Sequence, residues 1–133
     1  MTAERMIPQT QDRETAPFFQ AALEGKLVIK HCKDCDNGVH PPSAICPHCG
    51  SWNTEWKEVS GRGKLYTWTA VEHTVHPAYP APYTIVVVQL DDIKRVRLVG
   101  DLPGRPEMKE GMPMKVRFQK LADGVVLPNW DVA

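Results

Sequence analysis

The residues of this chain with the clearest chemistry are its four cysteines, which form two pairs. Cys32 and Cys35 are separated by two residues, as are Cys46 and Cys49, and ten residues lie between the pairs. Cysteines at this spacing in a tight turn direct both sulfur atoms to one point, and two such turns form a tetrahedral four-thiolate site. The pattern predicts one structural Zn²⁺ ion, whose binding stabilises the fold. Disulfides, an empty site and iron are the alternatives.

Other candidate chemistry in the chain is weaker. A filled four-sulfur shell leaves no position for water or substrate, so we do not expect catalytic zinc. Three histidines lie close to the cysteines and are possible replacement ligands, although we interpret them as loop residues: His31, His40 and His48. His73 and His76 follow Glu72 in a proline-rich loop and form at most a weak acid–base candidate. The sequence contains no phosphate-binding glycine loop and no nucleophile elbow, and the metal takes every cysteine. We therefore expect a binding or assembly module that is not an enzyme on its own.

Composition limits the class of protein. The chain has 133 residues, with 16 basic and 16 acidic side chains and zero net charge, so it has no overall positive field for nucleic acid. Its longest apolar run, residues 85–88, is far shorter than the roughly 20 residues of a membrane span. The N-terminus lacks the apolar core of a signal peptide. These observations predict a cytoplasmic protein without a membrane segment.

The chain divides into three predicted parts. Residues 1–30 form a polar tail and a short amphipathic helix, which begins after Thr15 and ends before Gly25. This helix is too short to be stable alone, so it must dock on its own domain or on a partner. A strand is expected at 26–30, and the zinc ribbon occupies residues 31–60.

Residues 61–133 read as an all-β domain. Apolar alternation predicts five strands, and one face of the first is expected to carry Leu65, Thr67, Thr69 and Val71. The expected strands lie at residues 64–71, 83–90, 94–100, 114–119 and 125–127. Five short strands in about 70 residues are typical of a small OB-type barrel, with an SH3-like barrel as the alternative.

Two groups of surface residues are candidates for binding. The barrel has ten basic and eight acidic residues, and its basic side chains form either a solvated strand face or a site for a phosphate-bearing ligand. The candidates for phosphate contacts are Arg62, Lys64, Arg95 and Arg97. Aromatic side chains are frequent anchors of protein interfaces. The candidates for a partner interface are Phe18, Phe19, Tyr79 and Trp130.

Several motifs, taken in order, resemble a known family. The helix ends in residues 24–27, and the two cysteine pairs flank a His-Pro-Pro turn at 40–42. A Ser-Gly-Arg-Gly segment follows at 60–63, and a Gly-Met-Pro turn lies at 111–113. Together these motifs resemble the zinc-ribbon and OB-fold family associated with acyl-CoA enzymes, named domain of unknown function 35.

The resemblance implies a mainly β fold with an N-terminal helix, a rubredoxin-like zinc ribbon and a C-terminal five-stranded OB-fold barrel. It also implies an accessory subunit of a thiolase-like enzyme, whose large partner carries the catalytic residues. The small subunit would stabilise that partner, help shape the acyl-CoA site and share the acyl-CoA with it. The alternative is a protein that binds single-stranded nucleic acid through its OB-fold and ribbon, against which the zero net charge argues.

Overall fold

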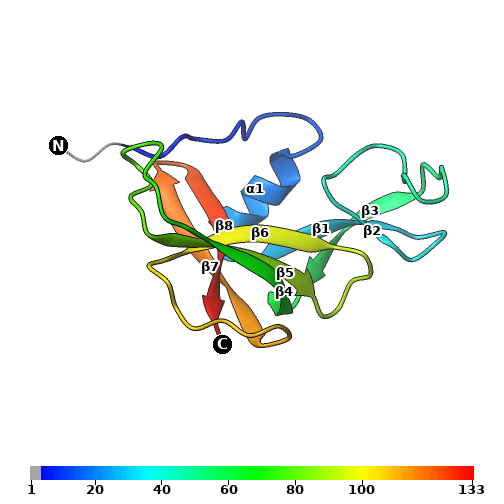
Figure 1. Cartoon of the computed structure of the whole chain (residues 1–133). Helices are drawn as coiled ribbons and strands as arrows, with labels where there is room; N and C mark the ends of the chain where they lie inside the picture. Colours follow the sequence, from blue (N-terminus) through cyan, green and yellow to red (C-terminus); the bar gives the residue numbers. More distant parts are fainter. Residues whose placement is uncertain (1–3) are drawn as a thin grey trace.

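The computed structural model describes residues 4–133, and this part of the chain forms one helix and eight strands (Figure 1). The fold is mainly β, with an N-terminal helix and a ribbon followed by a five-stranded sheet. This confirms the predicted fold class. The elements are α1 (Ala16–Leu23), β1 (Leu27–Cys32), β2 (Gly38–Val39), β3 (Thr54–Val59), β4 (Arg62–Val71), β5 (Tyr83–Leu90), β6 (Arg97–Pro103), β7 (Pro113–Ala122) and β8 (Val125–Val132).

The strands form two antiparallel sheets. The smaller sheet has the order β2-β1-β3 and carries the ribbon, and the larger has the order β6-β5-β4-β7-β8. In Figure 1 the ribbon projects to one side of the larger sheet, and α1 lies beside β1 and β8. Within residues 4–133, no helix combines the length and apolar content that crossing a membrane requires.

Helix α1 docks on its own chain, one of the two expected arrangements. Pro17 stands in its first turn, where a missing N–H costs nothing, and Gly25 ends it with a φ of 73° that favours glycine. Ala22 is buried against the strands that the helix contacts, β1 and β8. Burial of this face supplies the stability that eight residues lack in isolation.

A bulge changes the predicted faces of β4. Leu65 pairs with Val88 and Thr67 pairs with Val87, so Tyr66 is an extra residue on this strand. Paired residues share a face, and Val88 is fully buried whereas Val87 is only partly so. Leu65 therefore faces the core and Thr67 faces outward. The prediction that both lie on one face is wrong because the bulge shifts the alternation by one residue.

The two ends of the larger sheet meet through β6 and β8. Asn129 of β8 accepts a hydrogen bond from the Asp101 backbone N–H of β6 at 2.9 Å and donates one to the Asp101 carboxylate at 2.6 Å. Gly100 permits this approach, because a Cβ there would overlap the Asn129 amide and lie 2.7 Å from Trp130 Cδ1. The sheet is thereby closed across a seam of side-chain contacts.

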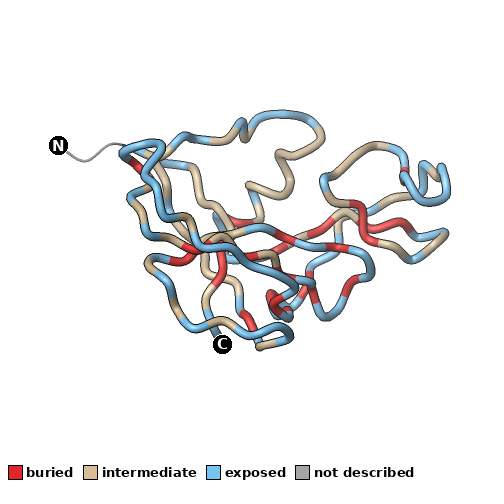
Figure 2. Tube along the Cα trace, in the orientation of Figure 1, coloured by how far each residue is buried: buried red, intermediate tan, exposed pale blue. Residues whose placement is uncertain are grey.

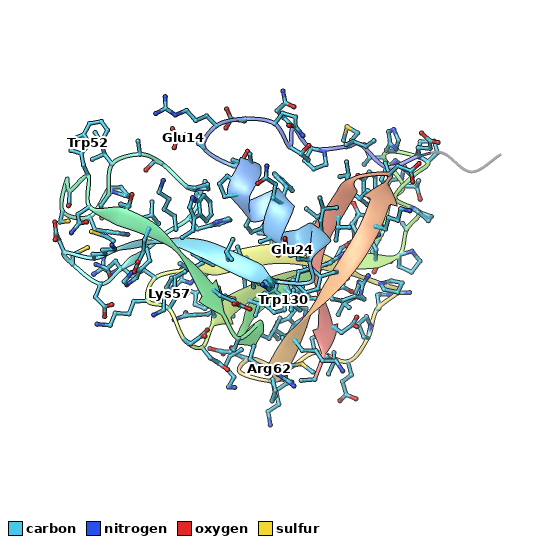
Figure 3. The ribbon with its side chains drawn as sticks, turned by 180° about the vertical axis from the view of Figure 1, so that it is seen from behind. Glu14, Glu24, Trp52, Lys57, Arg62 and Trp130 are labelled. Atoms are coloured by element: carbon cyan, nitrogen blue, oxygen red, sulfur yellow. The ribbon has the colours of Figure 1, made fainter. Side chains whose placement is uncertain are left out.

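The buried positions of the chain lie mostly along the strands (Figure 2). Trp130 follows Asn129 in β8 (Figure 3) and is only 1% exposed. The prediction that it anchors a partner at the surface is therefore wrong. Its position in β8, next to a residue that closes the sheet, directs the indole into the barrel core with Val86, Val88 and Met114. Loss of this side chain removes core packing.

The ribbon and the barrel share strand β1. Leu27 and Ile29, in its first half, belong to the barrel core, and Cys32, at its end, belongs to the core of the ribbon. A second junction forms where the Gly38 N–H donates to the Lys94 carbonyl at 2.8 Å. A Cβ at Gly38 would overlap Val96, so the close approach requires glycine.

Candidate metal centre

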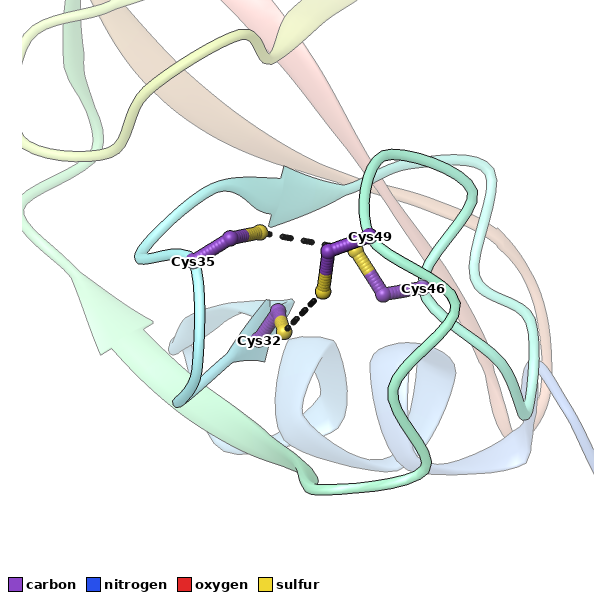
Figure 4. A group of neighbouring side chains, drawn as sticks. All are labelled: Cys32, Cys35, Cys46 and Cys49. Atoms are coloured by element: carbon purple, nitrogen blue, oxygen red, sulfur yellow. Dashed lines mark hydrogen bonds between the residues drawn. The ribbon is translucent and has the colours of Figure 1, made fainter.

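The four cysteines converge on one point between two loops (Figure 4). All four Sγ atoms lie within 4.8 Å of one another, and the Cys32–Cys49 and Cys35–Cys46 sulfurs are each 3.6 Å apart. A tetrahedral zinc site with Zn–S bonds of about 2.3 Å places its sulfurs about 3.8 Å apart. A disulfide requires about 2.05 Å. The arrangement fits one Zn²⁺ ion and confirms the cofactor prediction.

The two cysteine turns have the same backbone construction. The Cys32 carbonyl accepts from the Asp36 N–H at 2.9 Å, and the Cys46 carbonyl accepts from the Gly50 N–H at 2.8 Å. The residue that follows the second cysteine has a left-handed φ in both turns, 62° at Asp36 and 77° at Gly50. The Cys32 and Cys46 N–H groups each donate to the backbone carbonyl five residues later, at 2.9 Å in both turns. This repeated turn directs each pair of sulfurs inward.

Local hydrogen bonds and burial change the pKa values of two of the cysteines. The Asn37 backbone N–H, assisted by its side-chain amide at 3.3 Å, lowers the pKa of Cys35 to about 6. At Cys49 the Ser51 N–H acts in the same direction, but burial and the hydrogen bonds shared with the other three sulfurs outweigh it and raise the pKa to about 12. One thiolate therefore forms readily, and a bound cation is what stabilises all four.

A polar bridge connects the two turns outside the sulfurs. Asp34 accepts hydrogen bonds from the Ser51 hydroxyl and, at 3.1 Å, from the Asn53 amide, and these bonds lower its pKa. The carboxylate thus holds the second loop against the first. Because the bridge is exposed, it orients the loops and adds little stability.

Two of the three histidines near the cysteines, His31 and His40, have other partners, and His31 lies buried in β1 instead of in a loop as predicted. The His31 ring nitrogens contact Asp36 at 2.8 Å and Glu55 at 3.3 Å, and Asp36 also pairs with Lys94 at 3.1 Å. This chain of contacts links the ribbon to the barrel. His40 packs on the Phe18 ring, with centroids 5.7 Å apart. The sequence analysis did not predict this contact between the ribbon and the barrel. The charged residues around Cys35 are the one sign of it in the sequence.

The predicted basic residues are brought together only in part. Cross-strand pairing places Lys64, Gln89 and Arg97 in one row across β4, β5 and β6. Arg97 stacks 3.9 Å from the centroid of Tyr66, and Lys64 pairs with Asp91 at 3.4 Å. The row borders a shallow depression of about 270 Å³. The other two candidates lie outside this row, Arg62 at the start of β4 and Arg95 in the turn before β6.

The predicted aromatic anchors lie on two separate surfaces. Phe18 and Phe19 contact each other edge to face at 5.2 Å and line an apolar groove of about 520 Å³, together with His40, Pro41 and Val99. Tyr79 lies elsewhere, beneath the Arg5 guanidinium at 4.8 Å, beside a cavity of about 540 Å³. A further aromatic side chain, Trp52, is 72% exposed at the ribbon tip (Figure 3).

Comparison with known proteins places this geometry in a family. Residues 19–55 match the model of the ChsH2 rubredoxin-like zinc ribbon domain, and residues 56–119 match that of the ChsH2 C-terminal OB-fold domain. A DUF35 domain-containing scaffold protein of Pyrococcus furiosus is 36% identical over 102 residues, which cover 70% of this chain and 74% of the relative. The chain belongs to the DUF35 family. The match to the OB-fold model also favours the OB-type over the SH3-like barrel.

Two further matches carry enzyme names, one an aldolase and the other a hydratase subunit. The solved Ltp2-ChsH2(DUF35) aldolase contains a chain that is 32% identical, with a TM-score of 0.80, and the match covers 94% of this chain and 98% of that one. A probable enoyl-CoA hydratase alpha subunit of Thermomonospora curvata is 35% identical over 119 residues. That match covers 88% of this DUF35 chain but spans only 37% of the relative's length.

Proposed function

We propose that this DUF35 protein is a non-catalytic accessory subunit of a thiolase-like acyl-CoA enzyme. The observation that carries the proposal is its similarity, over almost the whole chain, to the DUF35 chain in the Ltp2-ChsH2(DUF35) aldolase. The hydratase subunit from Thermomonospora curvata is a second relative named for acyl-CoA chemistry. All four cysteines lie in the sulfur cluster, so a thiol nucleophile has to come from a partner.

The proposed role of the chain is to stabilise the catalytic partner and to complete its acyl-CoA site. CoA has a phosphorylated adenosine end, which favours contacts with guanidinium, ammonium and aromatic groups. The row of Lys64, Gln89 and Arg97, with Tyr66 beneath the guanidinium, offers these groups on one face. Arg62 and Arg95 extend the basic surface. We assign the phosphate contacts to this row.

The proposed partner contacts are the groove at Phe18 and Phe19 and the separate surface at Tyr79. The groove is apolar and open, and Val99 on its wall is 65% exposed. Apolar surface of this kind is typical of a docking face, and aromatic side chains at such a face contribute most of the binding energy.

The test of the proposed function is capture of the tagged full chain from its native extract, followed by reconstitution with the captured partner. We expect a stoichiometric thiolase-like chain whose acyl-CoA turnover and thermal stability both rise when this protein is added. Recovery of the protein alone, or a partner whose activity is unchanged by it, overturns the proposal.

The reconstituted complex also tests the assigned residues. Lys64→Ala and Arg97→Ala are expected to raise the KM for acyl-CoA several-fold, and Phe19→Ala to weaken assembly without that change in KM. Gln20→Ala, at an exposed position beside Phe19, serves as the matched control. Salt-dependent binding of single-stranded oligonucleotides by the isolated chain would instead support the nucleic-acid alternative.

A further inference from the structure

Strand β4 has a free edge along its second half. One edge pairs with β5 over residues 63–71, but the other pairs with β7 only over residues 62–64. Leu65 then exchanges hydrogen bonds with the connection that precedes β7, including one from its N–H to the Met112 carbonyl at 2.9 Å. Beyond Leu65, no backbone hydrogen bond within residues 4–133 joins this edge to another segment. Alternate N–H and C=O groups of residues 67–71 therefore have no ladder partner.

This free edge lacks the features that protect exposed strand edges. Thr67, Trp68, Thr69 and Ala70 are all exposed, and residues 65–71 contain no charged side chain and no proline. Natural sheets guard such edges with lysines, prolines or very short strands, because an unguarded edge is a template for another strand. Its composition, rich in β-branched and aromatic residues, also favours the extended conformation. The edge is built to be paired.

We propose that this edge pairs with the same edge of a second copy of the chain, antiparallel about a two-fold axis at Thr69. After the bulge at Tyr66, regular pairing with β5 runs over residues 67–71, and Thr69 is the centre of that stretch. Self-pairing about Thr69 uses all five residues. It joins β6, β5 and the second half of β4 of one copy to the same three strands of the other copy, whereas β7 stays paired with the first half of β4.

The sequence of the edge is complementary to itself in this register. Thr69 lies opposite Thr69 of the second copy, a pairing that antiparallel sheets favour. Trp68 lies opposite Ala70, so a large side chain meets a small one, and Thr67 lies opposite Val71, which is also β-branched. A charged side chain on the two-fold axis would lie opposite the same charge of the second copy. Residues 67–71 contain no charged side chain, so this repulsion does not arise. A strand from a different protein requires no such self-complementarity, so the observations favour a second copy.

The test is the mass of the zinc-loaded full chain measured by sedimentation equilibrium over a range of concentrations. We expect a reversible monomer–dimer equilibrium, with amide exchange at residues 67–71 slowing as the concentration rises. Thr69→Lys and Thr69→Glu each place like charges opposite one another at the axis and are expected to weaken dimerisation about tenfold. An equimolar mixture of the two variants pairs opposite charges and is expected to restore a mixed dimer.

Gln20→Lys and Gln20→Glu make the same charge changes at an exposed position of α1 and are expected to leave the equilibrium unchanged. A wild-type chain that stays monomeric at every concentration overturns the proposal. This outcome would leave the edge free for a strand of another protein. A dimer without slowed exchange at residues 67–71, or Thr69 variants that dimerise like the wild type, assigns association to another surface. Failure of the mixture to recover the dimer rejects the axis at Thr69.

Discussion

Truncation of Asn129 to alanine is expected to open the seam between β6 and β8. The Asn129 side chain is only 3% exposed and makes contacts on both sides of the closure. Its oxygen accepts from the Asp101 N–H at 2.9 Å, and its amide nitrogen donates to the Asp101 carboxylate at 2.6 Å and to Gln119 at 2.9 Å. In Asn129→Ala these three bonds to β6 and β7 are lost, together with a fourth, local bond that the Asn129 oxygen accepts from the Trp130 N–H at 2.8 Å.

The magnitude follows from these bonds. A net hydrogen bond contributes about 0.5–1.5 kcal/mol, so three of them amount to about 3 kcal/mol at their mean value. Asp101 and Gln119 are only half-buried, and water recovers part of this, which leaves an expected loss of about 2 kcal/mol. Asn129→Asp keeps the acceptor but places a carboxylate against Asp101. Its loss is expected to be larger at pH 7 and to shrink on acidification, as one of the two carboxylates takes up a proton.

The assay is equilibrium urea unfolding of zinc-loaded protein, followed by far-UV circular dichroism. Asn53→Ala is the matched control, since Asn53 makes its amide bond to Asp34 at the exposed ribbon surface, and the expected loss there is under about 1 kcal/mol. An Asn129→Ala protein within about 0.5 kcal/mol of the wild type refutes the assignment of closure to this side chain.

Three further outcomes are expected. Zinc removal by a chelator, or Cys46→Ser, should abolish amide protection in residues 33–53 while the barrel strands stay protected, and an unchanged ribbon would contradict the metal assignment. Trp130→Ala should lower the unfolding free energy by about 3–5 kcal/mol, whereas Trp52→Ala at the exposed ribbon tip should change it by less than about 0.5 kcal/mol; similar losses would place Trp130 outside the core. Burial lowers the pKa of His40 below its ordinary 6.5, so the unfolded chain binds the proton more readily and stability should fall as pH drops below 6.5. His40→Gln should reduce that slope in urea unfolding series, and an unchanged slope would refute the assignment.

Local chemistry made the metal centre and the element order predictable from sequence. The spacing of Cys32 from Cys35 is itself the geometry of a metal-binding turn, and it determines where two sulfurs point. Pro17 and Gly25 mark the two ends of α1 for backbone reasons that act within one turn. The apolar run of β5 was assigned with its correct bounds, since a strand buried on one face and partly covered on the other leaves a continuous signal.

Features that depend on distant contacts were not predictable in the same way. Tyr66 enters a bulge whose position is decided by pairing with β5 and β7, and alternation alone gives no sign of it. Trp130 and Asn129 stand near the C-terminus in a polar context, and only the approach of β6 to β8 makes one a core residue and the other a closing bond. Cross-strand register places Lys64 and Arg97 on either side of Gln89, and the sequence pattern carries no sign of that register.

Because β1 contributes to two cores, it limits where two related chains can be recombined into a chimera. The border between the two matched family models, at residues 55 and 56, falls inside β3, whose residues pair with β1 along its whole length. Recombination at that border would transfer part of a strand and separate Val59 from Leu27, its cross-strand partner. The ribbon and the barrel therefore form one structural unit, and a chimera of two DUF35 proteins should take α1 through β8 from a single parent, because the 104–112 connection lies between β6 and β7 of the same barrel.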